Sequence, residues 1–413
     1  MENKKRKSYF DELGFKATID KLVNHVSKLY SEDEIPWIVG YSGGKDSSAC
    51  LQLMWNVLEK LKSENKSIKP LHIITTDTLV ENPIVAAWVK NSLEAIGKGA
   101  SKQNLPFSPK LIFPRIEESF WVNLIGKGYP APRNKFRWCT DRLKINPSNR
   151  FISEVVNHNG EAILCLGART SESAARAKVI KKHSRFRIRE RLSPSSSLAG
   201  CMIYTPVEEF SNDDIWFYLN NTKNPWGINN KELMGMYAGA SKDGECPLVV
   251  DTNTASCGNS RFGCWVCTMV EQDKSMAAMI QNDSEKEWML PLLELRNALD
   301  FRNNTNPGQK LDHHLRDFRR MGGAVQLMQG GEYVPGPYTK KSRENWLKML
   351  LKAQAHVRQN GPVEVEKLDL INLDELQEIR RIWVVDKHEL EDTLPRIYEE
   401  ATGDEYPGRS LDD

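Results

Sequence analysis

The stretch Ser42–Ser47, S-G-G-K-D-S, places a cation, two hydroxyls and two adjacent glycines between an apolar β-rich run and a helical pattern. Gly43 and Gly44 allow the backbone to bend where a Cβ would clash, so the amides of the turn and of the following helix point into one concavity. Such a concavity binds anions through oriented N–H groups and the helix dipole. Lys45 adds a full positive charge, and Ser42 and Ser47 add hydroxyl donors. The stretch therefore predicts a site for the phosphates of a nucleotide.

The order of these residues differs from the phosphate loop of the common NTPases. That loop needs G-x-x-x-x-G-K followed by Ser or Thr, and the chain has no such spacing. The order S-G-G-K-D-S instead resembles the PP-loop of ATP pyrophosphatases. The resemblance implies that the loop grips the β- and γ-phosphates of ATP, together with Mg²⁺, and that the products are AMP and pyrophosphate.

Half of the eight cysteines fall within residues 246–267, with the spacing C-x10-C-x6-C-x2-C. These four are Cys246, Cys257, Cys264 and Cys267. The closing C-W-V-C pair has the spacing of metal ligands, and thiolates hold either zinc or an iron–sulfur cluster. Clustered thiols in a cytosolic chain indicate such a site rather than disulfides. The spacing leaves zinc and iron both open.

Cys139 stands apart in the basic stretch RNKFRWCTDRLKINP, residues 133–147. Neighbouring positive charge lowers the pKa of a thiol and raises its thiolate fraction, which suits a sulfur carrier or a nucleophile. A plain packing role for this cysteine stays open. Cys50, Cys165 and Cys201 fall in predicted helix or strand cores, and we assign them no function.

Strands and helices alternate over the first half of the chain. Apolar β-branched runs predict strands, and apolar positions at helical spacing predict helices. The predicted strands are 37–39, 71–78, 110–114, 161–168 and 201–207, and the predicted helices are 15–30, 47–61, 82–96 and 211–220. This order predicts an α/β fold with an open, mostly parallel sheet and helices on both faces. The resemblance of the loop to the PP-loop implies the same class, that of the adenine nucleotide alpha hydrolases.

The residues with chemical potential follow the ends of the predicted strands. Ser42–Ser47 follows the first strand, Asp77 lies at the end of the second, Arg115 follows the third, and Gly167 to Arg169 the fourth. Open parallel sheets bind ligands at the carboxyl ends of their strands. We therefore expect these residues to converge at one edge of the sheet.

Composition and pattern divide the chain into four regions. They are an N-terminal helical segment (1–34), a nucleotide-binding domain (35–240), a cysteine segment (241–290) and a mainly helical C-terminal region (291–413). In the last region we expect helices at 315–321, 344–357 and 369–384, and fraying of the acidic tail from Asp386.

The composition of the 413 residues, 40% hydrophobic and 27% charged, suits a soluble globular protein. We expect a cytoplasmic chain without membrane contact, because there is no run of 18 apolar residues and no apolar region of a secretory signal. The net charge of +2 argues neither for nor against binding of nucleic acid. Residues 176–191, however, hold a strongly basic segment whose one acid is Glu190. This segment is either a solvent-exposed helix face or loop, or a surface that binds the phosphate backbone of a nucleic acid.

Further stretches extend the resemblance beyond the loop. They are TDTLVENP (76–83), WVNLIGKGYPAP (121–132), FRWCTDRLK (136–144), GARTSESAARA (167–177), NPWG (224–227), and GECPLVVD and SCGNSRFGCWVC around the clustered cysteines. Together with S-G-G-K-D-S, and over about residues 35–340, they resemble the DndC family. Its members are the sulfurtransferases of bacterial DNA phosphorothioation, related in their first half to PAPS reductases. Analogous single-strand modification systems share the motifs.

This resemblance implies ATP pyrophosphatase activity and replacement of a nonbridging phosphate oxygen of DNA by sulfur. It implies a 4Fe–4S cluster on the four clustered cysteines, with DNA, a cysteine desulfurase as sulfur donor and other proteins of the phosphorothioation complex as partners. Asp77 and Gly167 would face the nucleotide, and Arg169 and Arg176 its phosphates. The catalytic candidates are Lys45, Asp46 and Cys139.

Three other functions fit parts of the sequence. A PAPS or APS reductase shares the loop, but those enzymes use a cysteine near the C-terminus or an adjacent Cys-Cys pair, whereas the last cysteine here is Cys267 and no such pair exists. A tRNA thiolase shares the loop and a cluster. The third alternative is not an enzyme. It is a DNA-binding subunit that senses a nucleotide and is stabilised by a bound zinc ion.

Overall fold

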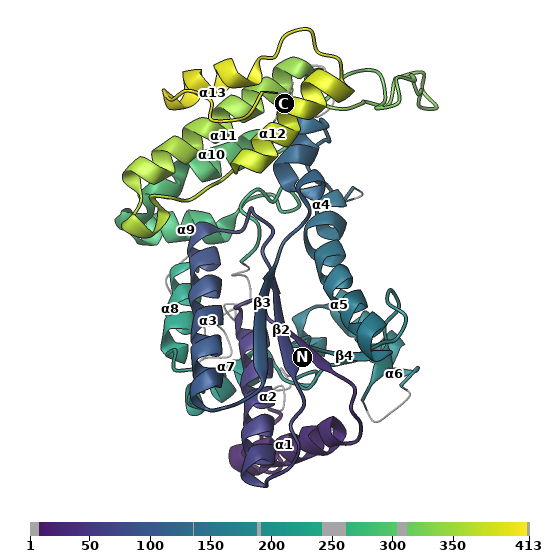
Figure 1. Cartoon of the computed structure of the whole chain (residues 1–413), viewed down its shortest axis with the longest axis vertical. Helices are drawn as coiled ribbons and strands as arrows, with labels where there is room; N and C mark the ends of the chain where they lie inside the picture. Colours follow the sequence, from purple (N-terminus) through teal and green to yellow (C-terminus); the bar gives the residue numbers. More distant parts are fainter. Residues whose placement is uncertain (1–7, 135, 188–190, 242–261, 304–311, 411–413) are drawn as a thin grey trace, which may run out of the picture. The chain divides into compact units, whose positions relative to one another are not determined.

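The computed structural model describes residues 8–134, 136–187, 191–241, 262–303 and 312–410 (Figure 1). The chain forms two compact units, each built from separate segments. The first consists of Met1–Thr76, Ile84–Ile112 and Ser148–Phe262, and the second of Asp77–Pro83, Phe113–Pro147 and Gly263–Asp413. The four contiguous regions expected from the sequence stay a prediction.

A six-stranded sheet in the order β3-β2-β1-β4-β6-β5 forms the centre of the first unit. Its strands are β1 (Trp37–Gly40), β2 (Leu71–Thr76), β3 (Phe107–Ile112), β4 (Ala162–Leu166), β5 (Ser193–Pro194) and β6 (Cys201–Tyr204). All neighbouring pairs are parallel except β5 with β6. The predicted α/β class with an open, mostly parallel sheet is confirmed.

Helices cover both faces of this sheet (Figure 1). They are α1 (Phe15–Ser31), α2 (Lys45–Ser63), α3 (Pro83–Lys102), α5 (Asn146–Asn159), α6 (Ala174–Ser184), α7 (Asn212–Asn221) and α8 (Asn230–Gly239). Side chains of a strand alternate between faces. Accordingly, Trp37 and Val39 of β1 join the core with α1, α2, α3, α7 and α8, whereas Ile38 joins a smaller core with α5.

The second unit is mainly helical in its described residues. Its helices are α4 (Trp138–Thr140), α9 (Lys274–Asn282), α10 (Leu290–Leu299), α11 (Lys340–Asn360), α12 (Leu373–Arg381) and α13 (Leu394–Thr402). Short π-helical turns at Val122–Gly126, Asp141–Ile145 and Ile382–Asp386 join them. Across the described ranges, no helix has both the length and the apolar character needed to cross a membrane.

Three local predictions are wrong. Residues 315–321 do not form a helix, because Asp317 exchanges backbone hydrogen bonds with Gly336 and Pro337 instead of with its own neighbours. The acidic tail does not simply fray, since α13 buries Leu394 and Ile397. The third strand starts at Phe107 rather than at residue 110. Pro109 is tolerated within it because β3 is an edge strand.

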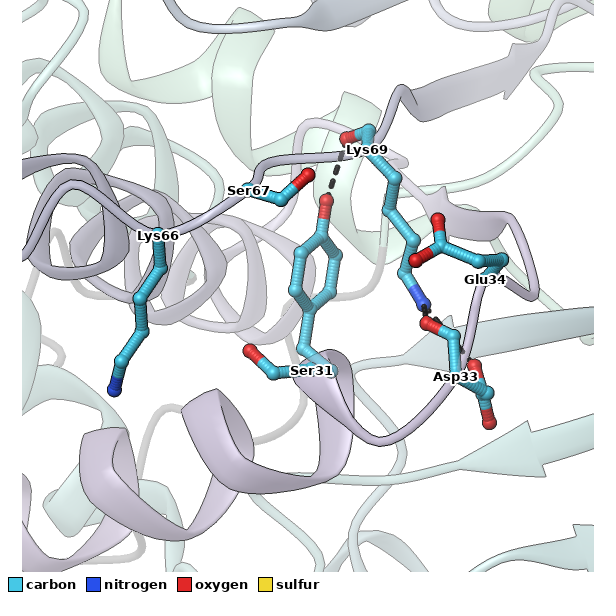
Figure 2. Close-up of a pocket in the computed structure, with 7 residues that line it drawn as sticks. Ser31, Asp33, Glu34, Lys66, Ser67 and Lys69 are labelled. Carbon is cyan, nitrogen blue, oxygen red and sulfur yellow. Dashed lines mark hydrogen bonds and ion pairs between the residues drawn. The ribbon is translucent and has the colours of Figure 1, made fainter.

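A hollow of about 230 Å³ lies where the chain enters β1 and β2 (Figure 2). Lys69 forms an ion pair with Asp33 at 3.1 Å, and the Tyr30 hydroxyl donates to the Lys69 carbonyl at 2.5 Å. The polar groups that line the hollow are thus largely paired with one another. It lies before the strands begin, at the end of the sheet opposite the glycine loop, so we assign it no part in the chemistry below.

Candidate active site

The glycine loop connects β1 to α2, as the sequence predicts. Gly43 has φ +73°, a conformation that glycine adopts without strain. A Cβ there would also meet Val89 at 2.5 Å. The indole Nε1 of Trp88 donates to the Gly43 carbonyl at 2.9 Å and fixes the turn. Gly44 is the N-cap of α2 and supplies no capping side chain, although the Tyr237 hydroxyl is hydrogen-bonded to the Lys45 backbone. An anion can therefore approach the start of the helix.

The two loop hydroxyls act partly within the loop. The Ser47 hydroxyl donates to the Gly44 carbonyl at 2.9 Å and accepts from the Ser42 amide at 3.1 Å. The hydroxyls of Ser42 and Ser47 are also 3.1 Å apart. In this structure both serines therefore hold the shape of the loop, and their predicted donation to a phosphate stays a prediction.

Lys45, Asp46 and Arg169 form a charged group at the start of α2. The Arg169 guanidinium donates to Asp46 Oδ1 at 2.8 Å, and Lys45 Nζ lies 3.4 Å from Asp46 Oδ2. Lys45 Nζ also lies 5.3 Å from the ring centre of Tyr237. Burial, followed by the charge of Arg169, lowers the pKa of the Lys45 ammonium, while Asp46 opposes this shift. Two cations against one carboxylate, at a helix N-terminus, suit binding of a polyanion.

Gly167 brings the end of β4 against the loop. A Cβ at this position would lie 2.5 Å from the Asp46 carbonyl oxygen and 2.9 Å from the Ser47 amide nitrogen. Only glycine allows this approach, which also brings Arg169 within reach of Asp46. The predicted convergence of the loop with Gly167–Arg169 is therefore present. Asp77 and Arg115 belong to the second unit, and their convergence with the loop stays a prediction.

The described thiols of the second unit lie among polar groups from distant segments. Glu81 and Cys264 form an isolated antiparallel bridge, and the Trp265 amide donates to the Val80 carbonyl at 3.0 Å. Thr78 Oγ1 lies 3.4 Å from Cys264 Sγ and donates to Glu81 at 3.0 Å. Lys144 Nζ lies 3.2 Å from the same Glu81 carboxylate. The segment TDTLVENP thus pairs directly with the C-W-V-C stretch.

Buried side chains hold the C-W-V-C turn in place. Trp265 packs against Trp121, with ring centres 5.8 Å apart, and the Cys267 amide donates to the Cys264 carbonyl at 3.0 Å. The fully buried Arg296 donates to the Cys267 carbonyl at 3.0 Å and pairs with Asp300 at 3.2 Å. A tight turn with both thiols on it is the arrangement that metal-binding cysteine pairs adopt.

Cys139 differs from its sequence-based prediction. Burial, followed by the charge of Cys267, raises the pKa of the Cys139 thiol, so the expected lowering by basic neighbours is wrong. The neighbours have other partners: Arg133 pairs with Asp312, and Arg142 stacks on Tyr129.

The remaining predicted site residues have the following places. Cys246 and Cys257 lie outside the described residues. Among the described residues, no group of three or more His, Cys, Asp or Glu side chains could hold a metal ion. Cys264 and Cys267 fit two of the four thiolates of a cluster. The Asp77 carboxylate accepts from the Leu79 amide at 2.8 Å, and burial raises its pKa. Arg176 is exposed and pairs with Glu172 at 3.2 Å.

Several residues that contribute to the candidate active site were not predicted from the sequence. Trp88, Tyr237 and Arg296 carry no motif signal, because their roles depend on packing between segments far apart in the chain. Glu81 and Thr78 lie in the quoted segment TDTLVENP, and that segment was the signal available for them.

Comparison with known proteins agrees with this geometry. Residues 36–269 match the phosphoadenosine phosphosulfate reductase domain family. The chain therefore belongs to that family and, with its glycine loop, to the PP-loop enzymes that use ATP.

One relative is an uncharacterized protein of Methanocaldococcus jannaschii, 25% identical over 204 residues. The match covers 49% of this chain but only 35% of that protein.

Two solved structures show distant likeness. The U34-tRNA thiolase of Methanococcus maripaludis, solved with its 4Fe–4S cluster, has a TM-score of 0.29 at 12% identity, covering 53% of this chain and 72% of that one. The FMN adenylyltransferase of Candida glabrata, in complex with FAD and inorganic pyrophosphate, has a TM-score of 0.32 at 10% identity, covering 60% and 74%. Similarity at this level carries no functional argument.

Proposed function

We propose that this protein is the sulfurtransferase of a DNA phosphorothioation system, which uses ATP to activate a backbone phosphate and then replaces a nonbridging oxygen by sulfur. The observation that supports it is the combination of two chemistries in one chain. A nucleotide loop with Lys45, Asp46 and Arg169 occurs together with three thiols, Cys139, Cys264 and Cys267.

ATP solves a leaving-group problem. A phosphodiester oxygen leaves phosphorus very poorly. Attack of that oxygen on the α-phosphorus of ATP forms a P–O bond, and pyrophosphate leaves with the electron pair of the broken bond. Lys45 and the N-terminal amides of α2 would stabilise the charge that develops on pyrophosphate, together with Mg²⁺. The DNA oxygen is then part of an AMP leaving group.

Sulfur transfer follows from thiol chemistry. The terminal sulfur of an enzyme persulfide, charged by a cysteine desulfurase, attacks the DNA phosphorus, and AMP leaves with the P–O electron pair. A second thiol then attacks the carrier sulfur, which forms a disulfide and leaves the terminal sulfur on phosphorus. A thiol reductant regenerates the pair. Cys139, which is not one of the four clustered cysteines, suits the role of the carrier, and a thiol of the reductant can act as the second thiol.

A 4Fe–4S cluster is part of this proposal. Cys264 and Cys267 would hold it together with Cys246 and Cys257, and Arg296 would keep the turn between the first two in place. When bound, the cluster would supply a sulfur-rich redox centre beside the carrier thiol.

The decisive experiment measures both halves of the reaction. Anaerobically purified protein, with a cysteine desulfurase, cysteine, DNA and ATP, should release AMP and pyrophosphate and should make the DNA cleavable by iodine. ATP consumption without AMP and pyrophosphate would contradict the proposal. Unchanged iodine cleavage of DNA from cells that carry Cys139→Ser would remove that thiol from the mechanism.

A sulfonucleotide reductase is the second candidate, and membership of the reductase domain family favours it. In that reaction a thiol would release sulfite from PAPS. Incubation with PAPS and thioredoxin separates the two candidates: sulfite without DNA sulfur would establish the reductase, and DNA sulfur without sulfite the transferase.

A further inference from the structure

Helix α6 presents a row of exposed cations on one face. Lys178, Lys181 and Lys182 recur at the spacing of one helical face, and Arg185 follows directly after Ser184, the last residue of the helix. All four are exposed, and none forms an ion pair with a described residue. At 1.5 Å per residue the three lysines extend over about 6 Å of the helix axis, and Arg185 lengthens the row beyond the helix.

The cations that do have partners lie outside this row. Arg176 pairs with Glu172 at 3.2 Å, and Arg187 pairs with Glu208 at 2.9 Å. No acid occurs between residues 173 and 189. A solvated helix face usually mixes both signs, whereas this face has one sign only.

An exposed aromatic ring adjoins the row. Phe186, 62% exposed, follows directly on Arg185. Val179 is also exposed, one residue after Lys178. An aromatic ring next to basic side chains binds unpaired bases by stacking, while the cations follow the backbone. A paired duplex offers no free base face to such a ring.

The row is linked to the nucleotide loop through the chain. Arg169, which binds Asp46 of the loop, is separated from the start of α6 by only four residues, and these include the 3₁₀ turn Thr170–Glu172. A strand bound along α6 would therefore be held by the same unit that contains the loop.

We propose that the α6 row, defined as Lys178, Lys181, Lys182 and Arg185 with Phe186, is the binding surface for a single-stranded DNA segment, whose backbone follows the cations and one of whose bases stacks on Phe186. This inference rests on the proposed function, because it identifies the surface that holds the DNA to be modified.

The test compares two triple variants of the full chain. Lys178→Ala/Lys181→Ala/Lys182→Ala removes the three lysines of the row, and Lys16→Ala/Lys21→Ala/Lys28→Ala removes three exposed lysines from α1 as a matched control. Binding of a fluorescent, mixed-sequence single-stranded DNA is measured over a range of salt concentrations. The α6 variant should bind about tenfold more weakly and should lose about 2 from the slope of log K against log salt. The α1 variant should bind like the wild type.

Phe186→Ala separates stacking from charge. It should weaken single-strand binding about five- to tenfold, leave binding of the matching duplex unchanged, and be rescued by Phe186→Trp. Equal losses in the α6 and α1 variants, wild-type binding by the α6 variant, or binding of RNA in place of DNA would each overturn the inference.

Failure of the inference is distinguishable from failure of the proposed function. If the wild type makes phosphorothioate DNA while the α6 variant binds DNA normally, only the surface is wrong. If the wild type makes none with ATP and sulfur donor present, the proposed function is wrong.

Discussion

The two regions with chemical potential are constructed in opposite ways. The nucleotide loop consists of six consecutive residues, Ser42–Ser47, between one strand and one helix. The thiol region draws on segments 77–83, 138–145, 264–268 and 296–302, which only folding brings together. A site made of consecutive residues can be recognised in the sequence as a motif, whereas a site assembled from distant segments depends on long-range contacts. The comparison teaches that the two halves of the proposed reaction should be separable by mutation.

The regions also differ in their electrostatics. In the loop, two cations face one carboxylate, and the buried Lys45 ammonium has a lowered pKa. Among the thiols, burial raises the pKa of Cys264 to about 12, and the nearby ammonium of Lys144 is paired with Glu81. The first arrangement is suited to bind an anion, and in the second burial favours the protonated form of the Cys264 thiol.

The largest expected effect comes from Cys264→Ser. This variant should lose bound iron and DNA sulfur completely but keep AMP formation, because the loop does not depend on the thiol turn. Iron analysis, iodine cleavage and AMP release measure the three properties. Cys201→Ser, a buried thiol of β6, is the matched control and should keep all of them. Loss of AMP formation in Cys264→Ser alone would show that the two regions act as one.

Lys45→Ala tests the opposite half. We expect a 10²- to 10³-fold slower release of AMP and pyrophosphate, because a charge that acts on the developing pyrophosphate is removed. Iron content and DNA affinity should stay unchanged. Lys60→Ala, further along α2, serves as the control for loss of a lysine from the same helix. A Lys45→Ala protein that loses DNA binding but still releases pyrophosphate would reverse our assignment.

Glu375 should make the stability of the second unit depend on pH. Burial raises the pKa of this carboxyl from 4.5 to about 7, so the folded state retains a proton that the unfolded state has lost. The stabilisation is complete below pH 4.5 and disappears as the pH rises through 7, which amounts to about 3 kcal/mol. Glu375→Gln cannot ionise and should lack this change.

Urea denaturation at pH 5 and pH 8 measures the effect of Glu375. The free energy of unfolding of the wild type should fall relative to that of Glu375→Gln between the two pH values. The exposed Glu364→Gln should follow the wild type. Parallel profiles for wild type and Glu375→Gln would show that the carboxyl is ionised in the folded unit.

Gly167→Ala should have the smallest effect. The added Cβ would press on the Asp46 backbone, which we expect to lower the free energy of unfolding by about 1–3 kcal/mol and to raise the KM for ATP. Gly235→Ala is the control, because a Cβ there meets nothing within 4 Å and α8 should gain about 0.5–1 kcal/mol. Equal stability of the two variants would mean that β4 and the loop move apart freely.

Long-range contacts explain where the sequence-based predictions fall short. Residues 315–321 have helical spacing, yet Asp317 binds backbone groups of Gly336 and Pro337. Cys139 has basic neighbours in sequence, yet burial and Cys267 determine the direction of its pKa shift. Both errors have one cause: spacing along the chain reports local neighbours, and these residues are governed by distant ones.

The sequence by itself determined the α/β class, most strand positions, the helix that begins at Ser211, and the glycine loop. These depend on periodicity, on turn chemistry and on backbone conformations that glycine permits, all of which act over a few residues. Only the tertiary structure decided that Arg169 binds Asp46, that Lys45 is partly desolvated beside Tyr237, and that Glu81 and Lys144 surround Cys264. Those contacts join residues tens to hundreds of positions apart, and packing alone brings such residues into contact.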